Sequence, residues 1–273
     1  METNEKLIQM RSEIKKMGKV IVAFSGGVDS TLVLKVATEV LGRNALAITA
    51  SSPSLAESEL EETKSLAAEM GANHEIIFTQ EMEDENYASN PINRCYFCKT
   101  ELYDKLQVVA KERGIGYILD GLNADDVGDY RPGMKAAKEH LIISPLKDAG
   151  ITKNEIREIA KGMGLPNWDK PSSPCLSSRF PYGTIITLKG LRMVDKGETF
   201  LRELGVKGNL RVRYLEKMAR IEVESSEFGI ITENYEKINS HFRTLGFEFV
   251  ELDLRGFKSG RMNEAITLKK EKN

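Results

Sequence analysis

The sequence of 273 residues lacks the features of a membrane or secreted protein. No apolar run approaches the roughly 18 to 20 residues that a membrane-spanning helix needs, and the segment from Met1 to Gly18 is charged and amphipathic. Only three cysteines are present, an odd number that does not suit a disulfide framework. We therefore expect a cytoplasmic protein whose cysteines are metal ligands or reactive thiols.

An excess of basic charge is also missing. The formal net charge is -2, which disfavours a protein whose main function is to neutralise the phosphates of a nucleic acid. With 41% hydrophobic and 29% charged residues, the composition is typical of a soluble globular protein. A small-molecule substrate is favoured.

Short apolar runs alternate with segments long enough for crossover helices in the first part of the chain. A helix ending at Gly18 comes first, and capping boxes at Ser54–Glu57 and Thr152–Glu155 begin helices that we expect to end at Gly71 and Gly164. This pattern predicts an α/β fold with a doubly wound parallel sheet. The predicted strands are Val20–Phe24, Ala45–Ala50, Glu75–Phe78, Tyr117–Asp120 and Leu141–Ile143.

Proline and serine are concentrated between Leu165 and Tyr182, a composition that indicates an ordered functional loop or a linker. We predict a domain boundary there, with the α/β domain at residues 1–168. Residues 169–273 would form a smaller α+β domain for substrate binding and homo-oligomerisation. Its predicted elements are a helix at Leu188–Leu204, strands at Leu210–Tyr214 and Arg220–Glu224, a helix at Phe228–Leu245 and a strand at Glu248–Leu252.

A glycine-containing loop, Ser25-Gly26-Gly27-Val28-Asp29-Ser30, joins the first predicted strand to a helix. Backbone N–H groups and the helix N-terminus converge at such a loop, so it suits an anion. The two glycines allow close approach of a phosphate, and the two serine hydroxyls can donate hydrogen bonds. The Gly-Lys-Ser/Thr ending of a Walker loop is absent, which disfavours kinase-type transfer. A plain strand-to-helix turn, with Asp29 favouring the helix dipole, is the alternative.

The motif SGGVDS resembles the pyrophosphate-loop (PP-loop) ATP pyrophosphatases, a superfamily with an adenine nucleotide alpha-hydrolase-like fold. The resemblance implies that ATP is cleaved between its α and β phosphates and that AMP is transferred to a substrate. NAD and GMP synthetases and several sulfur-inserting enzymes belong to that superfamily.

A turn rich in carboxylates, Gly121-Leu122-Asn123-Ala124-Asp125-Asp126, follows the strand at Tyr117–Asp120. An open α/β sheet binds its ligands at this edge, so we include Gly121 in the ATP site. Asp125 or Asp126 could hold the Mg²⁺ that screens the triphosphate, and Arg131 could balance phosphate charge. An ordinary Asx turn or helix cap is the alternative for the two aspartates.

The three cysteines fall in two motifs. Cys95-Tyr96-Phe97-Cys98 lies at the start of a predicted helix, and Cys175 lies in the proline- and serine-rich segment. Three thiols without a convincing histidine nearby do not complete a zinc tetrad. A 4Fe-4S cluster held by three cysteines fits the count better, because one iron then accepts an exogenous ligand. A Cys-x-x-Cys dithiol and three unrelated buried cysteines remain as alternatives.

The segments KPSSPCLSSRFPYG, NRCYFCKTELYDKL and DGLNADDVGDYRPG, together with the nucleotide loop, closely resemble the LarE family over nearly the whole chain. These enzymes are ATP-dependent sulfur transferases of nickel-pincer nucleotide cofactor biosynthesis, which serves lactate racemase maturation. The resemblance implies adenylation of a carboxylate of pyridinium-3,5-biscarboxylic acid mononucleotide. Sulfur then replaces oxygen to give the thiocarboxylate, with release of AMP and pyrophosphate.

Members of that family are of two kinds. One kind sacrifices the sulfur of a single cysteine at the position of Cys175, and the other holds a 4Fe-4S cluster on three cysteines. Cys95 and Cys98 place this sequence with the second kind, so the resemblance implies a catalytic role for all three cysteines. Sulfide or a cysteine desulfurase would be the sulfur source.

Charged residues of the second domain are candidate substrate ligands. Arg211 and Arg213 alternate on a predicted strand, so they share a face and could grip a phosphate together. The pattern alone favours instead their pairing with Glu222 and Glu224 across the hairpin. In the resembling family an arginine pair of this sort receives the substrate phosphate, which favours the first interpretation.

Three further residues are predicted near the substrate. Arg179 follows Cys175 closely and would contact a phosphate, because a sulfur donor must lie beside a negatively charged adenylate. The resemblance also implies roles for Glu198 and Glu222. Tyr96 could stack on the substrate ring, although a core aromatic is equally compatible with the sequence.

The main alternative function is tRNA thiolation, which would use the same loop, cysteines and cluster. Such an enzyme usually carries a basic face or an added RNA-binding module, and neither is evident here. A nucleotide-binding protein without turnover and an amide-forming synthetase are further alternatives, although the second leaves the cysteines unexplained.

Overall fold

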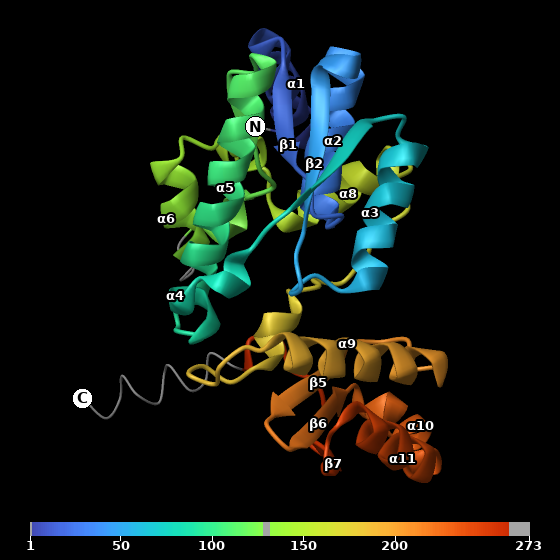
Figure 1. Ribbon diagram of the computed structural model, residues 1–273. Coiled ribbons are helices and arrows are strands. Elements are labelled where there is room, and N and C mark those ends of the chain that lie inside the picture. Colours follow the sequence, from blue (N-terminus) through green and yellow to red (C-terminus); the bar gives the residue numbers. More distant parts are fainter. Residues whose placement is uncertain (1, 128–131, 262–273) are drawn as a thin grey trace, which may run out of the picture. The chain divides into compact units, whose positions relative to one another are not determined.

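A computed structural model describes residues 2–127 and 132–261 of the chain. The chain divides into two compact units (Figure 1). Unit 1 comprises Met1–Asp84 and Asn93–Ser173, and unit 2 comprises Glu85–Ile92 and Pro174–Asn273. In the described parts of the chain, no helix is both long enough and apolar enough to cross a membrane.

Unit 1 is built on a parallel sheet with the strand order β3-β2-β1-β4. Val22 in the central strand pairs with Ala47 on one side and Leu119 on the other. The side chains of Val20, Ile21 and Val22 are fully buried, as expected for a parallel strand covered on both faces. The strands are β1 (Val20–Ala23), β2 (Ala45–Ser51), β3 (Asn73–Phe78) and β4 (Tyr117–Leu119).

Helices cover both faces of this sheet, which confirms the predicted doubly wound α/β fold (Figure 1). One hydrophobic core contains Ile14, Leu32 and Ile156, and the other contains Ile21, Tyr103 and Leu106. The first is formed by α1 (Thr3–Met17), α2 (Val28–Leu41), α3 (Glu57–Glu69), the short α7 (Pro145–Asp148) and α8 (Lys153–Gly162). The second is formed by α5 (Arg94–Arg113) and α6 (Pro132–Glu139).

Two local predictions in unit 1 are wrong. The segment Leu141–Ile143 makes only an isolated bridge from Ile143 to Leu119, because Leu141 has a φ of 56°, which an extended strand does not allow. Ser54 does not cap a helix, since its hydroxyl donates to Glu81 at 3.0 Å and α3 begins only at Glu57. The capping box at Thr152 and Glu155 is confirmed at the start of α8, which ends at Gly162, two residues before the predicted stop.

Unit 2 has a three-stranded sheet with the order β5-β6-β7, in which β5 and β6 are antiparallel and β6 and β7 are parallel. Gly197 lets two helices pack closely, because a Cβ there would lie 3.1 Å from the Phe242 ring. The predicted helix at Phe228–Leu245 is interrupted at Asn234. The elements are α9 (Leu188–Glu203), β5 (Leu210–Leu215), β6 (Met218–Val223), α10 (Phe228–Glu233), α11 (Tyr235–Leu245) and β7 (Phe249–Leu252).

A short segment far from the rest of unit 2 in sequence also belongs to it. This strap, Glu85–Ile92, contains the one-turn helix α4 (Glu85–Ala88). The Tyr87 hydroxyl lies 2.6 Å from Ser177 Oγ, and the buried Asn90 side chain donates to the Pro181 carbonyl at 2.7 Å. The sequence prediction, with one boundary after residue 168, does not include the strap in the second domain. The bonds that hold the strap join residues 90 or 91 positions apart, which local sequence patterns do not reveal.

Candidate active site

The nucleotide loop closes around the N-terminus of α2. Gly26 has a φ of +72°, which favours glycine, and Gly27 is the N-cap of the helix. Ser30 Oγ donates to the Gly27 carbonyl at 3.1 Å, accepts the Ser25 N–H at 3.2 Å and lies 3.1 Å from Ser25 Oγ. Both hydroxyls and the first-turn N–H groups therefore meet at one point, as an anion site requires.

Close packing fixes the loop in place. A Cβ on Gly26 would lie 2.9 Å from Thr63 Cγ2 of α3, and a Cβ on Gly121 would lie 2.8 Å from the Ser30 backbone nitrogen. The buried Asn167 side chain donates to the Gly26 carbonyl and to Thr31 Oγ1, each at 2.9 Å. Asn167 is not among the residues predicted from the sequence, because no local pattern connects it to a loop that lies 141 positions earlier.

Lys153 supplies a cation to this loop. Its Nζ lies 2.6 Å from Asp29 Oδ2, and Asn123 Nδ2 donates to the other Asp29 oxygen at 3.5 Å. Lys153 is the first residue of α8, where the helix dipole disfavours a positive charge. A lysine in this unfavourable position of a predicted helix is the feature of the sequence that could have indicated a functional role for Lys153.

The aspartates after β4 act as caps. Asp125, the predicted Mg²⁺ ligand, accepts the Lys153 N–H at 2.8 Å, and the buried Asp126 accepts the Asn123 N–H at 3.1 Å. Both aspartates therefore make the contacts of an Asx turn or helix cap, the alternative interpretation of this turn. Magnesium binding by Asp125 stays a prediction. Arg131 lies outside the described residues.

The cysteines occur in both units. Cys95 and Cys98 are one turn apart at the start of α5 in unit 1, where Cys95 is exposed and Cys98 is partly buried. Cys175 is exposed and is the N-cap of a short 3-10 helix, Leu176–Arg179, in unit 2. Neither unit by itself brings three histidine, cysteine or acidic side chains together as a metal site within its described residues. Three accessible thiols are the donor set that an iron–sulfur cluster takes.

Lys99 follows Cys98 in α5, and its side chain packs against α6. Its stem packs against Gly133, where a Cβ would be 3.1 Å from Lys99 Cγ, and its Nζ lies 5.6 Å from the centre of the Tyr103 ring. Tyr103 donates to Asp120 at 3.3 Å, and burial raises the pKa of Tyr103 to about 12. The pKa of Lys99 is raised, first by Tyr103 and also by Cys98 and Asp120, although burial opposes the rise.

Tyr96 contacts α6. Its hydroxyl donates to Glu139 at 2.7 Å, and Lys135 Nζ lies 5.0 Å from the centre of its ring. The hydrogen bond to Glu139 raises the pKa of Tyr96. These contacts suit a structural aromatic, so stacking of Tyr96 on a substrate stays a prediction.

In unit 2, Arg179 holds the backbone that carries Cys175. It is 3% exposed, and its Nε and Nη2 donate to the two oxygens of Glu198 at 2.9 and 2.8 Å. Its Nη1 donates to the carbonyls of Pro174 at 2.5 Å and Cys175 at 3.1 Å. A contact between Arg179 and substrate stays a prediction, but the observed contacts position the thiol.

A second arginine supports the same loop. Arg213 donates twice to Glu222 Oε2, at 2.7 and 3.0 Å, and once to the Ser178 carbonyl at 2.9 Å. Arg261 Nη1 lies 3.6 Å from the other Glu222 oxygen. The cross-hairpin pairing that the sequence left open is therefore present for Arg213, whereas Glu224 accepts from Asn209 instead.

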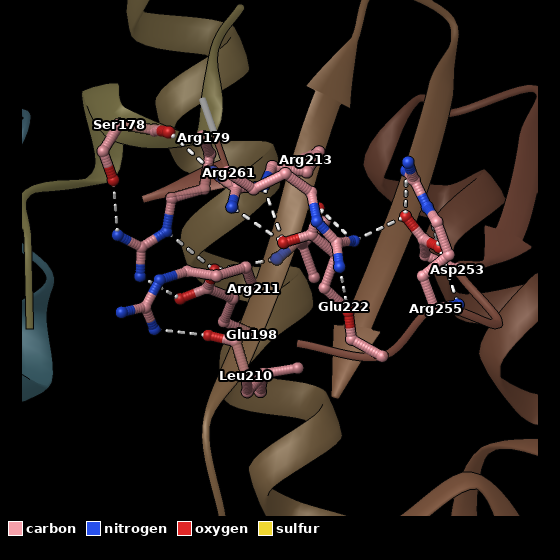
Figure 2. Close-up of polar contacts among 12 residues, drawn as sticks. Ser178, Arg179, Glu198, Leu210, Arg211, Arg213, Glu222, Asp253, Arg255 and Arg261 are labelled. Carbon is pink, nitrogen blue, oxygen red and sulfur yellow. Dashed lines mark hydrogen bonds and ion pairs between the residues drawn. The ribbon is translucent and has the colours of Figure 1, made fainter. Parts of the chain in front are cut away.

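Arg211 adds a further positive charge to this cluster. Its pKa is lowered to about 10, first by burial and also by the neighbouring Arg179 and Arg213, while Glu198 opposes the shift. Its guanidinium lies 5.2 Å from the centre of the Phe257 ring, and Nη1 donates to the Leu210 carbonyl at 2.6 Å. Guanidinium groups outnumber carboxylates in this cluster (Figure 2), so its electrostatic potential favours an anion. The members are Arg179, Glu198, Arg211, Arg213, Glu222, Asp253, Arg255 and Arg261.

A match to a known protein family covers the part of the chain that contains the nucleotide loop. Residues 1–92 match the NAD synthase family. Argininosuccinate synthase of Pyrococcus furiosus is 29% identical over 167 residues, which cover 56% of this chain and 40% of that protein.

Some relatives match along almost their whole length. The uncharacterized protein slr1717 of Synechocystis is 47% identical over 264 residues, which cover 96% of this chain and 98% of that protein. Pyridinium-3,5-bisthiocarboxylic acid mononucleotide synthase of Lactiplantibacillus plantarum is 40% identical over 255 residues, which cover 93% of this chain and 92% of that protein.

Proposed function

Because the chain belongs to the family of pyridinium-3,5-bisthiocarboxylic acid mononucleotide synthases, we propose that it is an ATP-dependent sulfur transferase. Its substrate would be the corresponding dicarboxylic acid mononucleotide and its product the thiocarboxylate. The structural observation that carries the proposal is the loop Ser25–Ser30, which forms an anion cradle at the N-terminus of α2 and is paired with Lys153. Such a cradle suits the pyrophosphate that leaves during adenylation.

The first half-reaction activates the substrate. A carboxylate oxygen forms a bond to the α-phosphorus of ATP, while the bond from that phosphorus to the bridging oxygen of pyrophosphate breaks. The loop holds the departing pyrophosphate, and Lys153 would leave Asp29 to neutralise its charge. Adenylation turns a poor leaving oxygen into a good one.

The second half-reaction transfers sulfur. A sulfur nucleophile forms a bond to the activated carbonyl carbon, and the bond from that carbon to the AMP oxygen breaks, so AMP leaves with the electron pair. The exposed Cys175 is held for this step by the Arg179 and Arg213 contacts to its loop. Arg211 would bind the phosphate of the mononucleotide, because its buried charge lies beside two other arginines.

Cys95, Cys98 and Cys175 would hold a 4Fe-4S cluster, whose remaining iron supplies a binding position for sulfur. The donor chemistry fits, because all three thiols are at least partly accessible. Magnesium would neutralise the triphosphate near Asp125.

The proposal is tested with protein purified and reconstituted without oxygen. ATP and the dicarboxylate mononucleotide are added with sulfide, and pyrophosphate, AMP and the mass of the mononucleotide are measured. We expect pyrophosphate release that depends on the mononucleotide, together with replacement of oxygen by sulfur. Tight, salt-sensitive binding of bulk tRNA without a response to the mononucleotide would favour tRNA thiolation instead.

A further inference from the structure

Lys99 is a partly buried cation that has no role in the two half-reactions described above. It makes no hydrogen bond or ion pair with any residue in the described ranges, 2–127 and 132–261. Its aliphatic stem is fixed against Gly133, and its ammonium faces the Tyr103 ring. Removing an ammonium from water without a partner is unfavourable, so a position of this kind is typical of a group that awaits an anion.

Lys170 in the same unit shows what a structural lysine looks like here. Its ammonium is held by Glu59 at 2.7 Å and Glu62 at 2.6 Å. Lys6 is likewise paired with Glu155 at 2.7 Å. Lys99 differs from both, because the carboxylate beside it, Asp120, accepts hydrogen bonds from the Tyr103 hydroxyl and the Leu122 N–H instead.

The surroundings of Lys99 connect it to the nucleotide loop. Asp120 directly follows β4, which pairs with the strand that leads into the loop. Gly121, the next residue, lies so close to α2 that a Cβ would be 2.8 Å from the Ser30 nitrogen. Lys99 is therefore close to Asp120, the residue before Gly121, and it lies on the helix that carries Cys95 and Cys98.

We propose that Lys99 is a catalytic residue that donates hydrogen bonds to the reacting carboxylate of the substrate during adenylation. This inference rests on the proposed function. A carboxylate that attacks a phosphate brings two negative charges together, and an ammonium between them lowers that repulsion. Lys99 keeps all its protons: the carboxylate oxygen bonds to the α-phosphorus, and the electrons of the broken bond leave with pyrophosphate.

The test compares Lys99→Met and Lys99→Gln, which keep much of the stem, with Lys99→Arg, which keeps the charge. Lys111→Met, an exposed position on the same helix, is the matched control. Mononucleotide-dependent pyrophosphate release is measured with the KM for ATP, the KM for the mononucleotide and the melting temperature. Two neutral variants are used so that poor folding of one leaves the other to decide.

The neutral variants should lose about 100-fold in kcat/KM for the mononucleotide, while the KM for ATP changes less than about twofold. Lys99→Arg should recover at least about tenfold of that loss, which a purely structural role would not allow. Activity of the neutral variants near that of wild type, or an equal loss in Lys99→Arg, would refute the role of Lys99. A wild-type enzyme that releases no pyrophosphate with the mononucleotide would refute the proposed function itself.

Discussion

Lys153 of α8 and Asp29 of the nucleotide loop form an ion pair of 2.6 Å. The pair joins two segments of unit 1 that are 124 residues apart in sequence. It gives the loop the cation that its own sequence lacks, since no lysine or arginine occurs between Ser25 and Ser30. Phosphate oxygens would compete with Asp29 for this ammonium, and the released carboxylate would then be available to a magnesium ion.

Lys153→Met should weaken ATP binding about tenfold or more, because the loop then offers only backbone and hydroxyl donors to the phosphates. Isothermal titration with ATP and magnesium measures the effect. Lys153→Arg is the matched variant and should bind ATP better than Lys153→Met. Equal affinity of wild type and Lys153→Met would show that the ion pair with Asp29 is purely structural.

Gly121→Ala should distort the nucleotide loop, because the new Cβ would lie 2.8 Å from the Ser30 nitrogen. Overpacking of this kind costs about 1–3 kcal/mol in the free energy of unfolding. ATP affinity should fall with it. Gly116→Ala is the control, since a Cβ there meets nothing within 4 Å. If urea unfolding and ATP titration give the same values for both variants, the close approach of Gly121 does not matter.

Much of unit 1 could be predicted because its signals are local. The apolar runs of β1 and β2, the glycine at the end of α1 and the capping box of Thr152 each determine the conformation of a few neighbouring residues. The Ser25–Ser30 loop was found for the same reason: strand, glycine pair and helix follow one another in sequence. The relatives then confirmed the family to which these motifs pointed.

The rest of the site depends on contacts between distant residues. Asn167 holds Gly26 from 141 positions away, and the strap binds a loop 90 positions further along. Leu141–Ile143 has the apolar composition of a strand, but the turn at Leu141 leaves only one bridge. Composition and periodicity do not reveal such contacts, because they report only on neighbours along the chain.

Glu155 predicts an acid-sensitive contribution to stability. Burial raises its pKa, but hydrogen bonds from Lys6, Thr152 and Thr3 outweigh burial and lower the pKa to about 2. A carboxylate with a depressed pKa stabilises the folded state above its unfolded pKa, and this contribution is lost as the pH falls toward about 2. Glu155→Gln should therefore lower the melting temperature near neutral pH.

The same substitution should also flatten the fall in melting temperature below about pH 5. Glu158→Gln, on the same helix, serves as the control because it lacks these partners among the described residues. Thermal unfolding followed by circular dichroism across this range gives the answer. Parallel pH curves for wild type and Glu155→Gln would contradict the assignment.

The cysteines predict a definite metal content. Protein reconstituted without oxygen should contain about four irons and four acid-labile sulfides per chain. Single substitutions Cys95→Ala, Cys98→Ala and Cys175→Ala should each lower both contents, because the cluster would lose one of its three thiolate ligands. Iron and sulfide assays measure this directly. Full retention of iron in all three variants would exclude the cluster, whatever the enzyme's activity.

Sulfur transfer to an adenylated carboxylate is the central claim, and the mass of the mononucleotide after reaction tests it most directly. With ATP, magnesium and sulfide, wild-type protein should convert the carboxylate to a thiocarboxylate, and Cys175→Ala should stop at adenylation and pyrophosphate release. An unchanged mononucleotide after complete incubation of reconstituted wild-type protein would contradict the claim.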